Sequence, residues 1–296
     1  MKRLTRSPKE RFFDSLIRII LILAAILTLF PFLYVVMISL LSPAEYMSRG
    51  LVFPLRPTLN NYAMLFKWGT KIQNAYLVTI GTTVVGTAIS LSATALLAYG
   101  LSRPALPGKS FVNGMLVLTM FFSGGLIPTY MVIKTIGLMN TYWALILPGS
   151  LSVWNVMVMR TFFKELPVEL EESAVLDGAS DARVAFSIMF PLSKASFATI
   201  GLFYAVGYWN QWYSAMLYLN DSKMYPLQMA LREIINTNAA TAMDATKMAG
   251  KMMDSTPPSI VTKMTSIVVS IGPVLILYPF VQKYFVKGVM VGSLKG

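Results

Sequence analysis

Long windows without a charged residue are the feature that most limits what this chain can fold into. The charge-free windows are Ile19–Ala44, Ile72–Ser102, Ser110–Ile133, Thr135–Met159, Ala195–Asn220 and Met264–Gln282. A hydrocarbon core about 30 Å thick needs about 20 helical residues free of uncompensated charge. An amphipathic helix of a soluble protein would instead carry charged residues at nearly every turn. The pattern therefore predicts six transmembrane helices rather than a large soluble all-α protein.

The composition supports this interpretation and excludes several classes of protein. The 296 residues are 55% hydrophobic and only 13% charged, which leaves too little polar surface for a soluble globule. Cysteine and histidine are absent, so disulfides, thiol nucleophiles, zinc-finger ligation and histidine acid–base chemistry are excluded. A net charge of +12 would suit a nucleic-acid partner in a soluble protein, but in a membrane protein it reflects topology. We expect membrane lipid as a partner and no nucleic acid.

Basic residues before the first window set the expected orientation. They are Lys2, Arg3, Arg6, Lys9, Arg11 and Arg18. The positive-inside rule keeps such a segment in the cytoplasm. The first window is too long for the apolar region of a signal peptide, so we expect it to remain as a signal anchor. With an even number of spans, both termini are expected in the cytoplasm.

This topology predicts one transmembrane domain, residues 19–285, between a cytoplasmic segment 1–18 and a cytoplasmic tail 286–296. The cytoplasmic loop 160–194 holds six of the thirteen acidic residues. The extracytoplasmic loop 221–263 is Met-rich and contains a short amphipathic pattern at Leu227, Leu231, Ile234 and Ile235. Neither loop is long enough to form a separate domain.

No ionisable residue lies at the middle of any window, and this bears on the energy source. A proton- or sodium-driven carrier would place a carboxylate there, and an intramembrane aspartyl protease would need two. The segment Gly108-Lys109-Ser110 is like the end of a phosphate-binding loop, but Arg103 occupies the position of its first glycine. We expect a pore subunit without its own motor, with no enzymatic activity, no catalytic residue, no metal and no cofactor.

The cytoplasmic loop carries the strongest local motif. It contains Glu172-Ser173-Ala174, then Gly178, then Ile188, Phe190 and Pro191. This spacing resembles the EAA motif of ABC importer permeases, with Ser173 in place of alanine and Phe190 in place of leucine. The wider string from Leu166 to Ser180 is similar to the sugar-importer branch of that family.

The residues of this loop also predict a short helix by themselves. Pro167 can open a helix, acidic residues in its first turns suit the helix dipole, and Gly178 permits the left-handed turn that ends it. The resemblance implies that this is the coupling helix that docks on the ATPase subunit. The implied coupling residues are Glu172, Ser173, Ala174, Asp177, Gly178 and Ala179. The alternative is an acidic loop exposed to solvent.

Further segments extend the resemblance along nearly the whole chain. Residues 127–130, 137–141 and 144–148 look like the span three to span four region of MalG-type permeases. The C-terminal residues 287–296 are similar to a family tail that enters the interface between the two ATPases, which implies contacts by Gly292, Ser293, Lys295 and Gly296. A frayed end is the alternative for this tail. The LplC-type branch, whose members often import oligosaccharides, is the subgroup that the chain resembles most.

The resemblance implies an all-α integral membrane protein with the six-helix type I importer (MetI-like) fold, in a bacterial cytoplasmic membrane. It implies a second homologous permease as heterodimer partner and two ABC ATPase subunits that bind ATP and Mg. It also implies an extracytoplasmic solute-binding protein, which would dock on residues 49–71 and 221–263, and a carbohydrate substrate, an oligosaccharide. The alternatives are an ABC importer for a non-sugar solute and a secondary carrier or channel that works alone.

The fifth window contains the aromatic and amide residues that suit a sugar pathway. They are Tyr204, Tyr208, Trp209, Asn210, Gln211 and Trp212. Ring faces cover the apolar surface of a pyranose, and amides pair with its hydroxyls. Helical spacing would place Tyr204, Tyr208, Gln211 and Trp212 on one face. The alternative is an aromatic belt at the membrane interface.

Small and polar residues in other windows predict close helix packing or pathway polarity. Gly81 and Gly86, among Thr and Ser residues of the second window, would let two helices approach closely. Asn74, Asn140 and Asn155 are weaker candidates for the pathway or for hydrogen bonds between helices.

Overall fold

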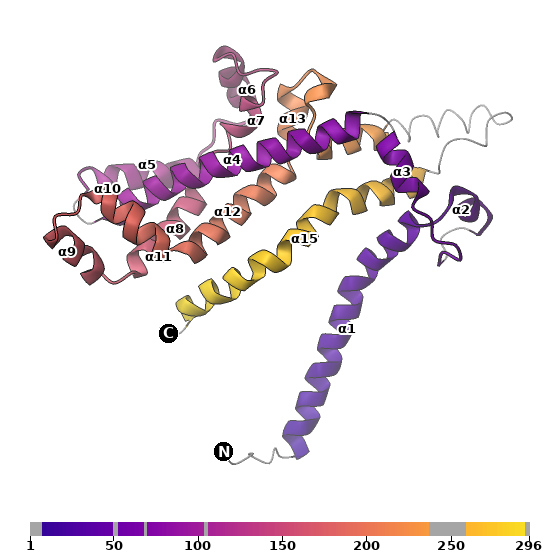
Figure 1. Cartoon of the computed structure of the whole chain (residues 1–296), viewed down its shortest axis with the longest axis horizontal. Helices are drawn as coiled ribbons and strands as arrows, with labels where there is room; N and C mark the ends of the chain where they lie inside the picture. The colour runs from indigo at the N-terminus through magenta and orange to yellow at the C-terminus, as the bar shows by residue number, and fades with distance from the viewer. Residues whose placement is uncertain (1–7, 50–52, 68–69, 104–105, 237–258, 294–296) are drawn as a thin grey trace. The chain divides into compact units, whose positions relative to one another are not determined.

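The computed structural model describes residues 8–49, 53–67, 70–103, 106–236 and 259–293. These residues form helices joined by turns, with no strand among them (Figure 1). The all-α class predicted from the charge-free windows is confirmed. The chain divides into two compact units, one made of residues 1–68 and 235–271 and the other of residues 69–234 and 272–296.

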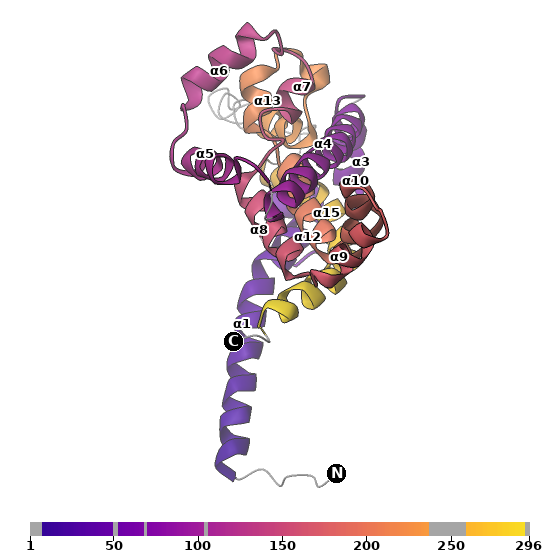
Figure 2. The ribbon, with the colours of Figure 1, turned by 90° about the vertical axis from the view of Figure 1, so that its left-hand side faces the viewer.

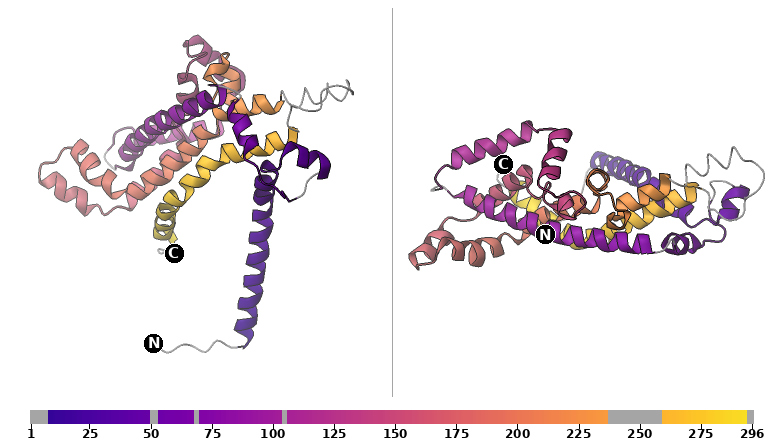
Figure 3. Two further views of the ribbon diagram at one scale, coloured as in Figure 1. Left: turned by 45° about the vertical axis from the view of Figure 1, so that its right-hand side comes forward. Right: turned by 90° about the horizontal axis from the view of Figure 1, so that it is seen from above.

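The first unit begins with a long apolar helix, α1 (Pro8–Ser39), which is one continuous rod in Figure 3. Two short helices follow it, α2 (Pro43–Arg49) and α3 (Asn60–Lys67). The buried Asn61 of α3 donates from Nδ2 to the carbonyl oxygens of Ser39 and Leu41, at 2.8 and 2.7 Å. Since the last carbonyls of a helix lack partners within it, this side chain caps the end of α1.

The second unit contains a series of helices and short helical turns. They are α4 (Thr70–Ser102), α5 (Lys109–Phe121), α6 (Leu126–Thr135), α7 (Trp143–Ile146), α8 (Val153–Glu165), α9 (Glu169–Leu176), α10 (Asp181–Val184), the π-helical turn η1 (Ala185–Met189), α11 (Phe190–Leu192), α12 (Lys194–Trp209), α13 (Tyr213–Tyr218) and the 3-10 turn η2 (Ser222–Met224). Residues 227–236 are also helical, which confirms the amphipathic pattern in that loop. Helix α15 (Ser259–Ser293), whose residues 259–271 belong to the first unit and 272–293 to the second, ends the described chain.

Helices α4, α8 and α12 pack together and form the main core (Figure 2). Small residues make this possible, because Ala95 and Ala98 of α4 are fully buried there. A Cβ atom at Gly86 of α4 would lie only 2.7 Å from the ring of Tyr208 in α12. The close approach predicted for Gly86 is therefore observed, whereas Gly81 has nothing within 4 Å of its Cβ position.

Two helices of the described chain are long and apolar enough to span a membrane, at residues 12–39 and 71–102. Two bent pairs meet the same criterion if each is one span: α5 with α6, bent by 117°, and α10–α11 with α12, bent by 82°. Figure 2 shows α5 and α6 running in different directions. The sixth window lies within α15, whose residues 260–276 form a shorter apolar helix.

The prediction of one continuous helix over residues 135–159 is wrong. Helix α6 ends at Thr135, α8 begins at Val153, and only the short α7 lies between them. Gly137 has a φ of 75° and Asn140 a φ of 55°, so the backbone leaves the helical region there. A charge-free window establishes that a segment is apolar, but it does not establish that its backbone is helical throughout.

Candidate functional site

Loop 160–194 contains the predicted short helix, α9, with a defined start and end. It begins at Glu169, two residues after Pro167. At its other end Gly178 has a φ of 81°, Gly178 N donates to Val175 O at 3.0 Å, and Ala179 N donates to Ala174 O at 2.9 Å. This pair of bonds around a left-handed glycine is the Schellman motif, which satisfies the last carbonyls of a helix.

The residues of the EAA motif divide between the solvent and the protein core. Glu172, Ser173 and Asp177 are exposed, whereas Ala174 is buried in the main core and Ala179 packs against it. The small side chain of Ala174 lets α9 lie close to the helices below it. The exposed side of α9 therefore remains available, and α9 lies at one end of the α4–α12 layer (Figure 1).

Glu171, the acidic residue next to the motif, forms an ion pair within the subunit. Its carboxylate forms an ion pair with the guanidinium of Arg103, which follows the last residue of α4. The guanidinium carbon of Arg103 lies 4.2 Å from the centroid of the Tyr99 ring, and Arg103 also donates to the Tyr99 hydroxyl. Tyr99 Oη in turn donates to the Asp181 carbonyl at 3.3 Å. We call Tyr99, Arg103 and Glu171 the α4–α9 latch.

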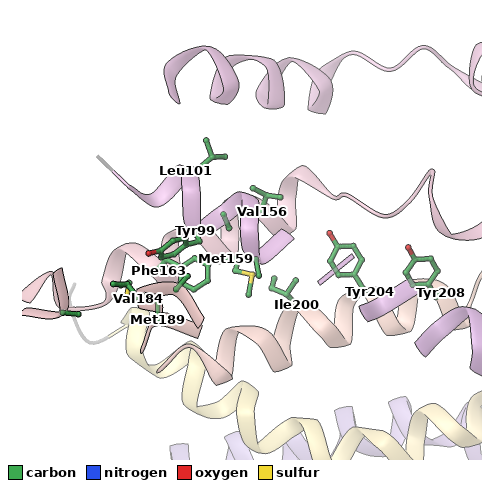
Figure 4. Close-up of a cluster of buried hydrophobic side chains, with 14 of the residues drawn as sticks. Tyr99, Leu101, Val156, Met159, Phe163, Val184, Met189, Ile200, Tyr204 and Tyr208 are labelled. Carbon is green, nitrogen blue, oxygen red and sulfur yellow. The ribbon is translucent and has the colours of Figure 1, made fainter. Parts of the chain in front are cut away.

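An aromatic cluster lies beside this latch and includes Phe190, the residue that replaces leucine in the motif. The Phe190 ring centroid lies 5.7 Å from that of Phe163, 5.9 Å from Tyr99 and 5.3 Å from Phe197. Figure 4 shows Tyr99 and Phe163 together at this end of the core. Edge-to-face and offset ring pairs of this kind add stability beyond their buried area. The larger phenylalanine is therefore accommodated without loss of packing.

The two tyrosines proposed for the sugar pathway lie in the interior of this unit. Tyr204 Oη bonds with Thr94 Oγ1 at 2.7 Å and accepts from the Ser152 amide at 3.0 Å. Tyr208 Oη bonds with Ser90 Oγ at 2.9 Å and donates to the Ile146 carbonyl at 3.0 Å. Figure 4 shows both rings side by side along α12.

These hydroxyls hold residues 145–152, the end of α7 and the non-helical segment after it, against α4 and α12. Gln211 adds a third bond, from Nε2 to the Leu145 carbonyl at 2.8 Å. Backbone groups outside a helix must find partners when they lie in an apolar environment. Tyr204, Tyr208 and Gln211 supply several of these partners.

The expectation that Tyr204, Tyr208, Gln211 and Trp212 share one helical face is wrong. Helix α12 ends at Trp209, and α13 begins only at Tyr213. Trp209 is buried and its ring centroid lies 6.3 Å from that of Tyr76, whereas Asn210 is exposed and Trp212 is half-buried. The six pathway residues thus divide into an interior group and a group at the break in the helix.

The three asparagines serve turns and helix contacts rather than one common site. Asn140 Oδ1 accepts from the amides of Asn220 and Asp221, at 3.0 and 3.2 Å, and holds the end of α13. Asn74 Nδ2 donates to the Lys223 carbonyl. Asn155 is buried in the first turn of α8.

The proposed C-terminal contact is only partly described. The backbone of Gly292 and Ser293 lies in the last turn of α15, while Lys295 and Gly296 lie outside the described residues. Within the described parts of the chain, no group of three Asp or Glu side chains could hold a metal ion.

Sequence reasoning missed two features, both of which depend on an arginine. One is the ion pair of Arg103 in the latch. The sequence indicates it only by an isolated basic residue at the end of a long apolar helix. The other is Arg232, whose guanidinium carbon lies 3.9 Å from the centroid of the Trp212 ring. No local pattern indicates that Arg232 and Trp212 would meet.

Comparisons with known proteins agree with this arrangement. Residues 110–291 match the family model described as binding-protein-dependent transport system inner membrane component. The chain is 42% identical over 289 residues to the polygalacturonan/rhamnogalacturonan transport system permease protein YtcP of Bacillus subtilis (strain 168), covering 97% of this chain and 100% of that protein. It is also 42% identical over 271 residues to Protein LplC of the same organism, covering 91% and 90%.

A solved structure is similar over nearly the whole chain. It is the crystal structure of a bacterial ABC transporter involved in the import of the acidic polysaccharide alginate, with a TM-score of 0.84 and 28% sequence identity, covering 95% of this chain and 99% of that one. The family match covers more than half of the chain, and two relatives exceed 40% identity over almost all of it. This chain therefore belongs to the family of binding-protein-dependent transport system inner membrane components.

Proposed function

We propose that this protein is the permease subunit of an ATP-driven importer for a carbohydrate and that it forms half of the translocation pathway. The observation that carries the proposal is α9, an acidic helix closed by a Schellman motif, with Glu172 and Asp177 exposed at one end of the bundle. It occupies the position of the EAA motif within the segment that matches the family model. The similarity to YtcP and to the alginate importer supports a carbohydrate as substrate.

The coupling step uses the exposed side of α9. Two separate ATPase subunits bind ATP and Mg and close on each other, and α9 of this chain docks on one of them through Glu172, Ser173 and Asp177. Ala174 and Ala179 join the helix to the core, so movement of α9 is passed to α4, α8 and α12. The residues at the C-terminal end, Gly292 to Gly296, add a contact between the two ATPases.

The family match supports the remaining partners of the proposal. A second, homologous permease forms the other half of the pathway as a heterodimer partner. An extracytoplasmic solute-binding protein docks on residues 49–71 and 221–263, of which residues 50–52, 68–69 and 237–258 lie outside the described residues, and delivers the sugar. Both termini lie in the cytoplasm of a bacterial cell, because the basic N-terminal segment stays on that side of the cytoplasmic membrane.

The substrate is an oligosaccharide, and the break after α12 faces its path. Asn210 and Trp212 at this break are accessible and offer an amide and a ring to a sugar. Tyr204, Tyr208, Trp209 and Gln211 support the wall of the pathway from inside the subunit.

Glu172→Lys in the assembled transporter tests the coupling role. We expect uptake of the sugar and stimulation of ATPase activity by the loaded binding protein to fall at least about tenfold, since the charge on the exposed side of α9 is reversed at a docking surface. Membrane insertion and assembly with the partner permease should be unchanged, because Glu172 is exposed.

Glu165→Lys provides the matched control. Glu165 is also an exposed glutamate, but it lies at the end of α8 outside the motif. Its reversal should leave uptake near the wild-type level. Full ATPase stimulation in Glu172→Lys would contradict the docking role, and uptake by the purified chain without ATPase subunits would contradict an ATP-driven importer.

A further inference from the structure

An exposed arginine stacks on a tryptophan at the break between α12 and α13. The Arg232 guanidinium carbon lies 3.9 Å from the centroid of the Trp212 ring, and the Tyr213 ring meets the Trp212 ring edge-on with centroids 5.5 Å apart. Gln228 Nε2 donates to Asn210 Oδ1 at 3.4 Å. We call Asn210, Trp212, Tyr213, Gln228 and Arg232 the aromatic–arginine cluster.

The sequence separation within the cluster explains how it is built. Gln228 and Arg232 are four residues apart in the helical segment 227–236, so they lie on the same face of that helix. This face meets residues 210–213, where α12 has ended and α13 begins. The Asn210–Gln228 amide pair and the stacked Arg232 side chain therefore lie next to each other at the break between α12 and α13.

Arg232 is held differently from Arg49, Arg103 and Arg160. Arg49 and Arg103 each form an ion pair with a glutamate. Arg160 donates to the Leu101 carbonyl and to Asn113 Oδ1. Arg232 is exposed and its guanidinium lies over the Trp212 ring, and among the described residues no carboxylate forms an ion pair with it.

Stacking leaves the hydrogen-bonding edge of the guanidinium free. The ring covers one face of the planar group, whereas all five N–H donors point outward in its plane. Such a fork matches the two oxygens of a carboxylate in a bidentate pair. Contact with the ring also fixes the side chain, so less rotamer freedom is lost when an anion binds.

The position of the cluster suits a site that a substrate meets early. Figure 1 shows α9 and α13 at opposite ends of the layer formed by α4 and α12. If α9 faces the cytoplasmic ATPase, as proposed above, the cluster lies toward the extracytoplasmic end. A sugar released by the binding protein reaches that end first.

We infer that the aromatic–arginine cluster recognises the carboxylate of an acidic sugar residue, a uronate, in the transported oligosaccharide. This inference rests on the proposed carbohydrate import. Arg232 binds the carboxylate. Asn210 Nδ2 donates one N–H to the Val206 carbonyl at 2.9 Å, and its second N–H pairs with a neighbouring hydroxyl of the sugar. Trp212 holds the guanidinium in place and presents the rest of its ring to the sugar.

Arg232→Gln in the complete transporter, reconstituted in vesicles with its binding protein, tests this inference. The substrates are a short oligogalacturonate and its methyl ester of equal length, which lacks the negative charges. We expect Arg232→Gln to lower kcat/KM for the acid at least about tenfold and to change that for the ester by less than about twofold, because only the acid loses a charge-assisted pair. The kcat/KM of Arg232→Lys for the acid should lie between those of the wild type and Arg232→Gln, since lysine keeps the charge but loses the planar fork.

Lys223→Gln is the matched control, because Lys223 is an exposed cation of the same loop without an aromatic partner among the described residues. Equal losses in Lys223→Gln and Arg232→Gln would show that only general surface charge matters and would overturn the inference. An unchanged ratio of acid to ester uptake in Arg232→Gln would also overturn it.

A binding measurement separates this inference from the proposed function. Titration of the purified transporter with oligogalacturonate should change its tryptophan fluorescence, and the change should be lost in Trp212→Phe and weakened about tenfold or more in Arg232→Gln. Binding with this pattern, but without uptake of any sugar, would support the site and contradict carbohydrate import. Uptake of the acid by a protein whose fluorescence response does not depend on Arg232 would support import and contradict the site.

Discussion

At the scale of single residues, the second unit depends on a few contacts between small groups and fixed rings. Tyr208 is the clearest case. Its ring lies where a Cβ of Gly86 would be, and its hydroxyl bonds to Ser90 and to the Ile146 carbonyl. Because both bonds orient the ring, it has little freedom to move away from a larger neighbour.

We therefore expect Gly86→Ala to destabilise the protein by about 1–3 kcal/mol, the usual cost of overpacking a well-packed core. Gly81→Ala lies on the same helix with nothing within 4 Å of the new methyl group, and it should be neutral or slightly stabilising. Thermal unfolding of the purified variants in detergent measures the difference. Equal melting temperatures for the two variants would show that α4 and α12 are not in this close contact.

Tyr204→Phe and Tyr208→Phe distinguish a structural role from contact with sugar. Each removes a hydroxyl that satisfies a backbone group of the interrupted segment, Ser152 N or Ile146 O, which costs about 1–3 kcal/mol for a buried group left unpaired. We expect lower thermal stability with an unchanged KM for the sugar. Tyr213→Phe, at an exposed position, should leave stability unchanged. A raised KM with wild-type stability would instead indicate that the two tyrosines line the pathway and contact the sugar.

At the scale of elements, α9 is attached to the bundle by two different kinds of contact. Ala174 and the rings around Phe190 supply apolar packing, while Arg103 and Glu171 supply an ion pair. The two charged side chains are 16% and 28% exposed. Such a pair falls between an exposed pair, worth about 0–1 kcal/mol, and a buried one, whose disruption costs about 3–5 kcal/mol.

Charge reversal tests whether this latch holds α9 in the position needed for coupling. Arg103→Glu places two carboxylates together and should lower ATPase stimulation by the loaded binding protein about tenfold, with less effect on basal ATPase activity. The double variant Arg103→Glu, Glu171→Arg restores opposite charges and should regain at least about half of the lost stimulation. Failure of this rescue, with normal assembly, would show that the ion pair does not position α9.

The boundaries of α9 could be predicted from the sequence because they depend on local chemistry. Pro167 precedes the helix, and Gly178 adopts the left-handed conformation that ends it. Its attachment could not be predicted in this way. Arg103 and Glu171 are far apart in the sequence, and only the packing of α4 against the loop brings them together.

At the scale of the whole molecule, the charge-free windows identified the apolar segments but not their backbone conformation. Window 72–102 is one helix, α4. Window 110–133 is interrupted between α5 and α6, window 135–159 around α7, and window 195–220 between α12 and α13. The interruption around α7 is stabilised because side chains of α12 and residue 211 bond to the backbone of residues 145–152.

The amino-acid sequence by itself determined the all-α membrane class, the family and the presence of a short acidic helix in loop 160–194. These properties follow from the spacing of charges, from helix-start and helix-end residues, and from a motif read along the chain. Only the tertiary structure decided that Tyr204 and Tyr208 point into the subunit, that Glu171 pairs with Arg103, and that Arg232 stacks on Trp212. The physical reason is that each of these contacts joins residues from different helices, whose approach depends on packing that no local pattern records.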